Sequence, residues 1–298
     1  MRGQGRRFGA PWVASAPRSG APAHVATARR AIAGAPACCY TANVSDGTVE
    51  LGLRALLRAA AFGGSTLATL GLWEVHTRVM PGDARARTLE TYRRGWSSAF
   101  LRSLEVDVSA EPAPPPSGER ARLIVSNHRS LLDIPVLLRH FGGRMLSKSE
   151  VAEWPVAGPL AKHAQTIFVD RGDKMSGAKA IRAMRSALRE RSTLTVFPEG
   201  TVHPGDEVQP FLPGAFTAAS GLDVEIVPVA LAYPSLHEWG GVDIRAHVER
   251  LMTAPRATVG LAVGTPFVVS GSTRALSETA REAVQSLVPR ARRRASHR

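Results

Sequence analysis

The sequence predicts an α/β fold in which a largely parallel or mixed sheet is flanked by helices. Two observations after residue 120 support this. Short apolar runs typical of buried strands alternate with helical patterns, and polar clusters directly follow three of the runs. Before residue 110, a long apolar segment and a basic amphipathic segment predict helices instead. For this length we expect one domain of catalytic size with appended segments.

The composition allows a sizeable core, and the charge is concentrated at the two ends. Of the 298 residues 44% are apolar, so folding requires neither metal ions nor disulfides. The formal net charge is +13, but six arginines precede the first acidic residue, Asp46, and five more follow Pro289. This leaves 27 basic against 25 acidic residues, or about +2, between Asp46 and residue 288. A basic membrane-surface or nucleic-acid-binding protein is the non-enzyme alternative, but aromatic residues make up only 6%, and we expect no nucleic-acid partner.

Residues 1–45 predict a disordered basic extension. They are rich in Ala, Arg, Pro and Gly, lack apolar periodicity, and contain no apolar segment long enough for a secretory signal. An organelle transit peptide is the alternative. Both cysteines, Cys38 and Cys39, lie in this segment, so we expect neither a disulfide framework nor a Cys-ligated zinc site in the core. A reducing cytoplasmic environment is expected.

Residues 46–110 predict a membrane-associating helical region. The segment 55–73 has nineteen residues and one charge, Arg58, which is just long enough to cross a bilayer. Glycines and hydroxyl residues at 63–66 dilute its middle, so a shallow or re-entrant membrane helix is an equal alternative.

A basic amphipathic helix is predicted over residues 85–104. Apolar side chains recur every three or four positions, at Leu89, Tyr92, Trp96, Phe100 and Leu104, with Arg85, Arg87, Arg93, Arg94 and Arg102 between them. Such a helix lies at a membrane surface or docks on a protein core. The neighbouring apolar segment favours the membrane.

A proline-rich break at residues 111–120 is expected to precede a globular domain over residues 121–275. Strand-like runs occupy 122–126, 166–169, 193–197, 226–232 and 258–263, and helical patterns occupy 131–141 and 174–190. Residues 276–298 are expected to form a helix and a basic tail.

Polar clusters follow three of the strand-like runs. His128 follows the first, Asp170 and Arg171 follow the second, and the sequence Pro-Glu-Gly-Thr at 198–201 follows the third. Because ligands bind where the strands of such sheets turn toward helices, we expect these side chains to converge on one cleft.

His128 and Asp133 are candidates for acid–base chemistry. A histidine acts as a general base near neutral pH when a second group fixes its tautomer and stabilises the imidazolium. Residues five apart on an ideal helix point about 140° apart, so His128 must precede the helix, with Ser130 as its N-cap. The spacing from Ser130 to Asp133 also fits a capping box, in which the carboxylate only satisfies backbone donors. From spacing alone, capping is the simpler interpretation.

The sequence Asn-His-Arg-Ser-Leu-Leu-Asp at 127–133 resembles the NHxSxxD block of the glycerolipid acyltransferase superfamily, best known from the 1-acylglycerol-3-phosphate O-acyltransferases. Phe-Val-Asp-Arg at 168–171, Phe-Pro-Glu-Gly-Thr at 197–201 and Val-Pro-Val at 227–229 are similar to three further blocks, in the same order. The resemblance extends over residues 86–270. It implies transfer of an acyl group from a thioester to a lipid hydroxyl, without a covalent acyl-enzyme.

The resemblance also implies a role for each matching residue. His128 and Asp133 would be the catalytic pair, and Arg171 and Glu199 would bind the phosphate and glycerol region of the acceptor. From the residues alone, these two would be a surface ion pair and a turn residue. The other expected substrate-binding residues are Gly200, Thr201 and Lys148. A glycine at position 200 suits both a close backbone approach and a turn with positive φ.

Two departures from the family bear on the acceptor. Members that use lysophosphatidate usually follow the third block with Arg-Ser and later carry a lysine before a glycine, whereas this chain has Val202-His203 and Leu212-Pro213. Fixed cations hold a dianionic phosphate best. Lysophosphatidate, giving phosphatidate, is the first expectation, with Arg171, Lys148 and His203 as the compensating cations. Lyso-ornithine lipid, which has an amino-acid head group, is the alternative.

No cofactor or metal is expected, because removing a proton from a hydroxyl and stabilising an oxyanion require neither. The chain contains no GxSxG, HExxH or Walker A motif, so hydrolase, zinc-protease and P-loop interpretations lack support. Acyl-CoA or acyl carrier protein is the expected acyl donor, and membrane lipids are the expected partners. We therefore expect a membrane-associated enzyme of phospholipid biosynthesis with its catalytic domain on the cytoplasmic side.

Overall fold

A mixed sheet forms the centre of the protein. The computed structural model describes residues 52–116, 118–154, 157–170 and 172–296, so the predicted extension over 1–45 lies outside the described residues. The strands are β1 (Val106–Ala110), β2 (Ala121–Ser126), β3 (Arg144–Lys148), β4 (Ile167–Val169), β5 (Thr193–Val196), β6 (Val224–Ala232), β7 (Ala257–Val263) and β8 (Phe267–Val268). The order is β1-β7-β6-β2-β5-β3-β4, with β8 paired to β6. β6 runs antiparallel to β7 and β8, and every other described pair is parallel.

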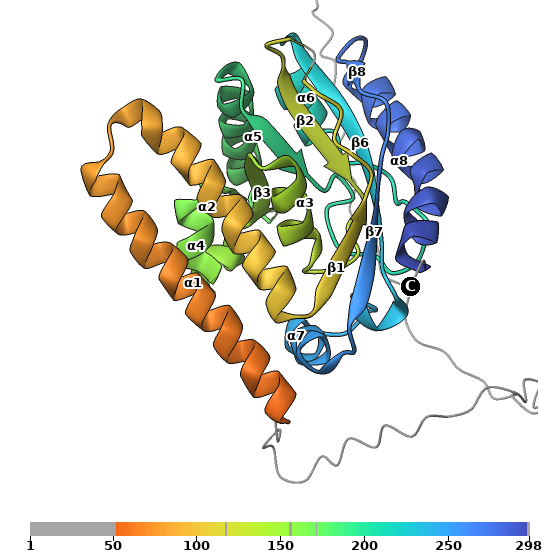
Figure 1. The fold of residues 1–298 in the computed structure, drawn as a ribbon. Coiled ribbons are helices and arrows are strands. Elements are labelled where there is room, and N and C mark those ends of the chain that lie inside the picture. The colour runs from red at the N-terminus through yellow and green to blue at the C-terminus, as the bar shows by residue number, and fades with distance from the viewer. Residues whose placement is uncertain (1–51, 117, 155–156, 171, 297–298) are drawn as a thin grey trace, which may run out of the picture. The chain divides into compact units, whose positions relative to one another are not determined.

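Helices cover both faces of the sheet (Figure 1). They are α1 (Leu53–Val79), α2 (Gly82–Ser103), α3 (Asp133–Phe141), α4 (Ala157–His163), α5 (Lys174–Arg189), α6 (Gly214–Ala219), α7 (Ile244–Thr253) and α8 (Thr273–Ser296), with short 3₁₀ turns η1 (Ser149–Glu153) and η2 (Ser235–His237). Leu123 and Val125 pack on the side of α5, α6 and α8, whereas Ile124 packs on the side of α2, α3 and α7. Burial on both faces explains why the strand sequences are continuously apolar.

The sheet extends further along the chain than the sequence predicted. β1 lies before the proline-rich break and pairs with β7, so residues 111–120 connect two strands of one sheet and do not mark a domain boundary. The basic tail is also part of the fold, because α8 continues to Ser296 and buries Ala291 against β7. Arg290 and Arg294 form ion pairs with Glu111, so the predicted basic tail continues the helix and packs on the fold.

α1 and α2 form a helical hairpin beside the sheet (Figure 1). The predicted aromatic face of α2 packs against α1, with the Phe62 and Phe100 rings 4.9 Å apart and Trp96 Nε1 donating to Thr66 Oγ1 at 2.9 Å. The docked-helix alternative is therefore the correct one for this face of α2. Arg93, which is nearly buried, and Arg94, which is exposed, both bond to Glu90 and to backbone carbonyls.

α1 is the described helix that is long and apolar enough to cross a membrane. It runs unbroken through the glycines at 63–64 and exposes an apolar face, formed by Leu53, Leu56, Leu57, Leu67, Leu72, Val75 and Val79. Arg58, by contrast, is buried and donates to three carbonyls at the C-terminal end of α7, those of Leu251, Met252 and Ala254. Because helix C-termini leave carbonyls unpaired, this arginine caps α7 and fixes α1 to the catalytic domain.

Candidate active site

Three neighbouring strands deliver the candidate residues to one edge of the sheet. β2, β5 and β6 are mutually parallel, and their carboxyl ends lead into His128, Glu199 and Tyr233. Asn127 fixes the exit from β2, because its side chain donates to Leu231 O at 2.9 Å and accepts from Leu231 N at 2.8 Å. This pair of bonds prolongs the contact between β2 and β6 by one residue and turns the chain out of the sheet at His128.

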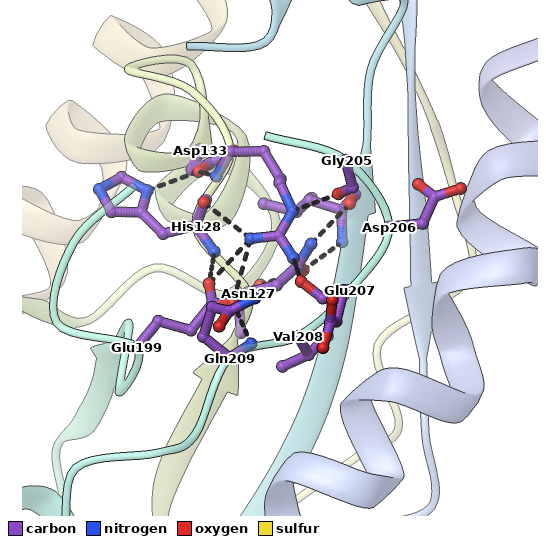
Figure 2. Close-up of polar contacts among 12 residues, drawn as sticks. Asn127, His128, Asp133, Glu199, Gly205, Asp206, Glu207, Val208 and Gln209 are labelled. Carbon is purple, nitrogen blue, oxygen red and sulfur yellow. Dashed lines mark hydrogen bonds and ion pairs between the residues drawn. The ribbon is translucent and has the colours of Figure 1, made fainter. Parts of the chain in front are cut away.

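His128 and Asp133 are hydrogen-bonded, with 2.6 Å between Nδ1 and Oδ2 (Figure 2). Oδ2 also accepts from the backbone N–H groups of Arg129, at 2.6 Å, and Ser130, at 3.0 Å. Oδ1 accepts from the hydroxyl of Tyr233 at 2.5 Å. Asp133 is the first residue of α3, so His128 lies before the helix as the spacing required. The carboxylate therefore binds backbone N–H groups of the turn and pairs with the imidazole at the same time, whereas the prediction of Ser130 as N-cap is wrong, because Leu132 is the N-cap of α3.

The imidazole of His128 is held in one orientation. Nδ1 faces Asp133, and none of the residues that the structure describes hydrogen-bonds to the opposite nitrogen, Nε2. The ring stacks on Phe197, with centroids 4.1 Å apart and planes inclined by 9°, and the side chain is 16% exposed. A neutral imidazole with Nδ1–H donated to a carboxylate presents a free lone pair at Nε2, which is the arrangement that a general base requires.

A buried ion pair joins Arg129 to Glu199, and Figure 2 shows Glu199 beside the backbone of His128. The Glu199 carboxylate accepts from Arg129 Nη1 at 3.0 Å, from His128 N at 2.6 Å and from Gln209 N at 2.9 Å. Arg129 Nε and Nη2 each donate at 2.7 Å, to the carbonyls of Gly205 and Glu207. Arg129 thus joins the catalytic loop to the segment 199–209. The Glu199 side chain has no exposed surface, so in this conformation its carboxylate supports the site from below and does not face the cleft, in contrast to the predicted contact with acceptor.

The other predicted substrate-binding residues differ in how the structure places them. Lys148 ends β3, is exposed and lies 3.6 Å from Glu150. Thr201 is exposed, and Gly200 has a φ of +81° in a turn closed by its N–H to Phe197 O at 3.1 Å. The turn alone accounts for this glycine, and an added Cβ would lie 2.7 Å from Leu212 Cδ1. Arg171 lies outside the described residues.

His247 of α7 is a buried residue near the catalytic loop that the sequence did not indicate. Its Nε2 lies 3.2 Å from Ser130 Oγ, and its ring stacks on Trp239 with centroids 4.9 Å apart. Burial lowers the pKa of His247 to about 4. This imidazole is therefore neutral at physiological pH and supports the loop without adding charge.

An apolar cavity of about 700 Å³ lies between the helical hairpin and the catalytic domain. Its lining comes from α1, α2, α3, α4 and α7 and includes Trp73, Trp96, Ile134 and Val248. Leu131, between His128 and Asp133 in the chain, also lines it, so the cavity reaches the catalytic loop. Its size and apolar lining suit a hydrocarbon chain. Within the described ranges, no group of three His, Cys, Asp or Glu side chains could hold a metal ion.

Known acyltransferases are similar to this chain in sequence and in fold. The family model described as Acyltransferase matches residues 105–232. A lyso-ornithine lipid O-acyltransferase of Pseudomonas aeruginosa is 34% identical over 248 residues, which are 79% of this chain and 92% of that protein. A 1-acyl-sn-glycerol-3-phosphate acyltransferase of Neisseria meningitidis is 30% identical over 152 residues, or 51% of this chain and 57% of that protein.

The crystal structure of the 1-acyl-sn-glycerophosphate acyltransferase PlsC of Thermotoga maritima shares the fold, with a TM-score of 0.63 at 22% identity over 80% of this chain and 94% of that one. The predicted α/β fold with a mixed sheet is confirmed. The Pseudomonas relative matches this chain over most of the length of both proteins, and the four sequence blocks occur in the expected order. The chain therefore belongs to the acyltransferase family.

Proposed function

We propose that the protein transfers a fatty acyl group from an acyl thioester to the free hydroxyl of a lyso-lipid, with His128 as general base. The observation that supports this most directly is the bond between His128 Nδ1 and Asp133, which leaves Nε2 available beside an apolar cavity. No cofactor or metal is needed for this chemistry.

In the proposed reaction, His128 transfers one proton from the acceptor hydroxyl to the leaving thiolate. Nε2 of His128 takes the proton of the acceptor hydroxyl as its oxygen attacks the thioester carbonyl carbon. The carbon–sulfur bond then breaks, and the leaving thiolate takes the proton back from the imidazolium. Asp133 stabilises the imidazolium between these two steps, and the stacked Phe197 keeps the ring in place.

The apolar cavity is proposed to hold the acyl chain of the donor. Each CH₂ group transferred from water into such a cavity contributes about 0.8 kcal/mol, so a long chain supplies much of the binding free energy. Acyl-CoA and acyl carrier protein both present this chain as a thioester, and either is a suitable donor.

Lyso-ornithine lipid is proposed as the acceptor, ahead of lysophosphatidate. This order reverses the one expected from the sequence blocks. It rests on the Pseudomonas relative, which is matched over 92% of its length, and on the loop after Glu199, where Val202 and Leu212 stand at positions that carry cations in lysophosphatidate enzymes. Leu212 packs close to Gly200, so no cation reaches the turn from that position. The Neisseria relative and the exposed Lys148 keep lysophosphatidate as the second candidate.

The exposed apolar face of α1 is proposed to contact the membrane, with the catalytic domain on the cytoplasmic side where acyl thioesters are found. Because Arg58 fixes α1 to α7, a helix that lies along the interface fits better than one that crosses the bilayer as an independent span.

An acceptor screen tests the function. The purified protein in lipid vesicles is offered one labelled acyl thioester together with lyso-ornithine lipid, lysophosphatidate, lysophosphatidylcholine or glycerol 3-phosphate. We expect the highest kcat/KM with lyso-ornithine lipid, and a rate of transfer at least about a hundredfold lower in His128→Ala. Val202→Arg restores a cation to the loop, so it should shift the kcat/KM ratio toward lysophosphatidate. A parent enzyme that prefers lysophosphatidate would reverse the order of acceptors, and one that acylates none of them would contradict the function.

A further inference from the structure

Tyr233 lies on the side of Asp133 that His128 does not occupy. It follows β6 directly, is wholly buried, and donates its hydroxyl to Oδ1 at 2.5 Å, while His128 bonds to Oδ2. Tyr233 belongs to none of the four sequence blocks. Its backbone is also anchored, because Arg292 of α8 donates to its carbonyl.

A hydroxyl donor on one oxygen alters what the carboxylate offers at the other. Each hydrogen bond to a carboxylate stabilises its negative charge and weakens its attraction for the proton of a neighbouring imidazolium. Burial and the nearby Asp133 raise the pKa of Tyr233 well above its ordinary value. The phenol therefore stays protonated and acts as a donor throughout the pH range in which an enzyme of this kind works.

We propose that Tyr233 is a positioning residue that orients the Asp133 carboxylate and limits its pull on the His128 proton, so that the lone pair of Nε2 is kept for the acceptor hydroxyl. This inference rests on the proposed role of His128 as general base. Without the hydroxyl, the full charge of Asp133 would act on the imidazole, the imidazolium would be stabilised, and the base would be protonated at a higher pH.

Other charged and titratable groups surround this cluster and must be considered in any pH experiment. They come from the catalytic loop, the 199–209 segment, η2, α7 and α8, and are Arg129, Glu199, His203, His237, Glu238, His247, Arg250 and Arg292. Arg129 pairs with Glu199, and Arg292 pairs with Glu238. Burial lowers the pKa of His237, and it brings the pKa of His247 to about 4, so His247 does not change charge near neutral pH. The backbone N–H of His203 donates to the backbone carbonyl of His128, so a further imidazole lies on a residue next to the site. The experiment is therefore done in parallel in a His203→Gln background.

The test compares the pH dependence of kcat/KM for acyl transfer in the parent and in Tyr233→Phe, using the full chain in vesicles. The expected result is a shift of the acidic limb to higher pH by about half a unit to one unit. The rate on the alkaline plateau should fall by about tenfold because the carboxylate loses an orienting donor. The KM values for thioester and acceptor should change little. Ser277→Ala removes a buried hydroxyl on α8, far from the site, and should leave the profile unchanged.

Replacement of Tyr233 by 3-fluorotyrosine makes the test independent of whether Tyr233→Phe folds. The more acidic phenol is a stronger donor, so the acidic limb should move in the opposite direction, to lower pH. An acidic limb that stays in place in both variants, with or without a lower rate, overturns the inference and leaves Tyr233 with a packing role only. A parent protein without acyl-transfer activity would instead contradict the proposed function, so the two failures are distinguishable.

Discussion

Asp133→Asn separates the two roles that the structure gives to one carboxylate. The amide oxygen of asparagine can take the place of Oδ2 and accept from the backbone N–H groups of Arg129 and Ser130, while its NH₂ group faces the hydroxyl of Tyr233, which can turn to accept. Asparagine and aspartate are nearly equivalent at helix N-termini. The capping role is therefore retained, and only the negative charge 2.6 Å from His128 Nδ1 is lost.

The expected effects on rate and on stability are very different in size. Loss of the charge that stabilises an imidazolium reduces turnover by about a thousandfold to ten-thousandfold, equivalent to about 4 to 5.5 kcal/mol in the activation free energy. The free energy of unfolding should change by no more than about 1 kcal/mol, which shifts Tm by about 2 to 4 °C in a domain of this size.

Single-turnover acyl transfer and thermal unfolding by circular dichroism measure the two quantities. Asp243→Asn is the matched control, because Asp243 caps α7 by accepting from Ala246 N and has no catalytic partner. It should retain the parent rate and show a similar small change in Tm. If Asp133→Asn keeps its rate within tenfold while Tm falls strongly, Asp133 acts only as a cap and the reasoning about the pair is refuted.

Four further variants test other parts of the structure. His128→Ala should lower the rate of acyl transfer at least about a hundredfold, as expected for a general base, with an unchanged circular dichroism spectrum; near-parent turnover would exclude this base. Arg129→Lys keeps the charge but cannot bond to Gly205, Glu207 and Glu199 together. We therefore expect a loss of about 2 to 4 kcal/mol in the free energy of unfolding and a KM that rises more for the acceptor than for the thioester. Equal changes in both KM values would show that the segment 199–209 does not affect binding of the acceptor. Leu56→Glu with Leu67→Glu should abolish sedimentation with vesicles without a change in Tm, because both side chains are exposed on α1. The comparison variant Arg93→Glu with Arg94→Glu should instead destabilise the protein, because these arginines bond to Glu90 and to backbone carbonyls. If this variant no longer binds vesicles but keeps the stability of the parent, α2 lies at the membrane.

The sequence predicted the strands whose residues are mainly apolar. β2, β5, β6 and β7 are mainly apolar because helices cover each side of the sheet, and β4, which is only partly buried, was recognised because its three residues are all apolar. β1 and β3, with the sequences VDVSA and RMLSK, are only partly buried and have no such signal. The aromatic face of α2 was misassigned because a helix that docks on another helix and one that docks on a membrane have the same periodicity.

The candidate site was predictable only as far as short-range spacing extends. His128 and Asp133 lie within one turn and its helix, so their pairing follows from local geometry. Tyr233 and His247 lie about a hundred positions along the chain from the residues they contact, Asp133 and Ser130. Strand pairing and helix packing bring them together, and no local sequence pattern encodes these contacts. Arg129 occupies the variable position of its block, and nothing in the sequence distinguishes an arginine that turns inward from one that faces solvent.

The contacts of Arg129 with the segment 203–209 have a consequence for how enzymes of this kind diverge. This arginine bonds to the carbonyls of Gly205 and Glu207, which every amino acid possesses, and to no side chain in that segment. Gly205 has a φ of +84°, which other residues rarely adopt, but mutations at Asp206 and Glu207 can change the size and charge of the surface of this segment while the path of the backbone is maintained. Under the proposed function, such changes would exchange one acceptor head group for another while His128 and Asp133 remain undisturbed.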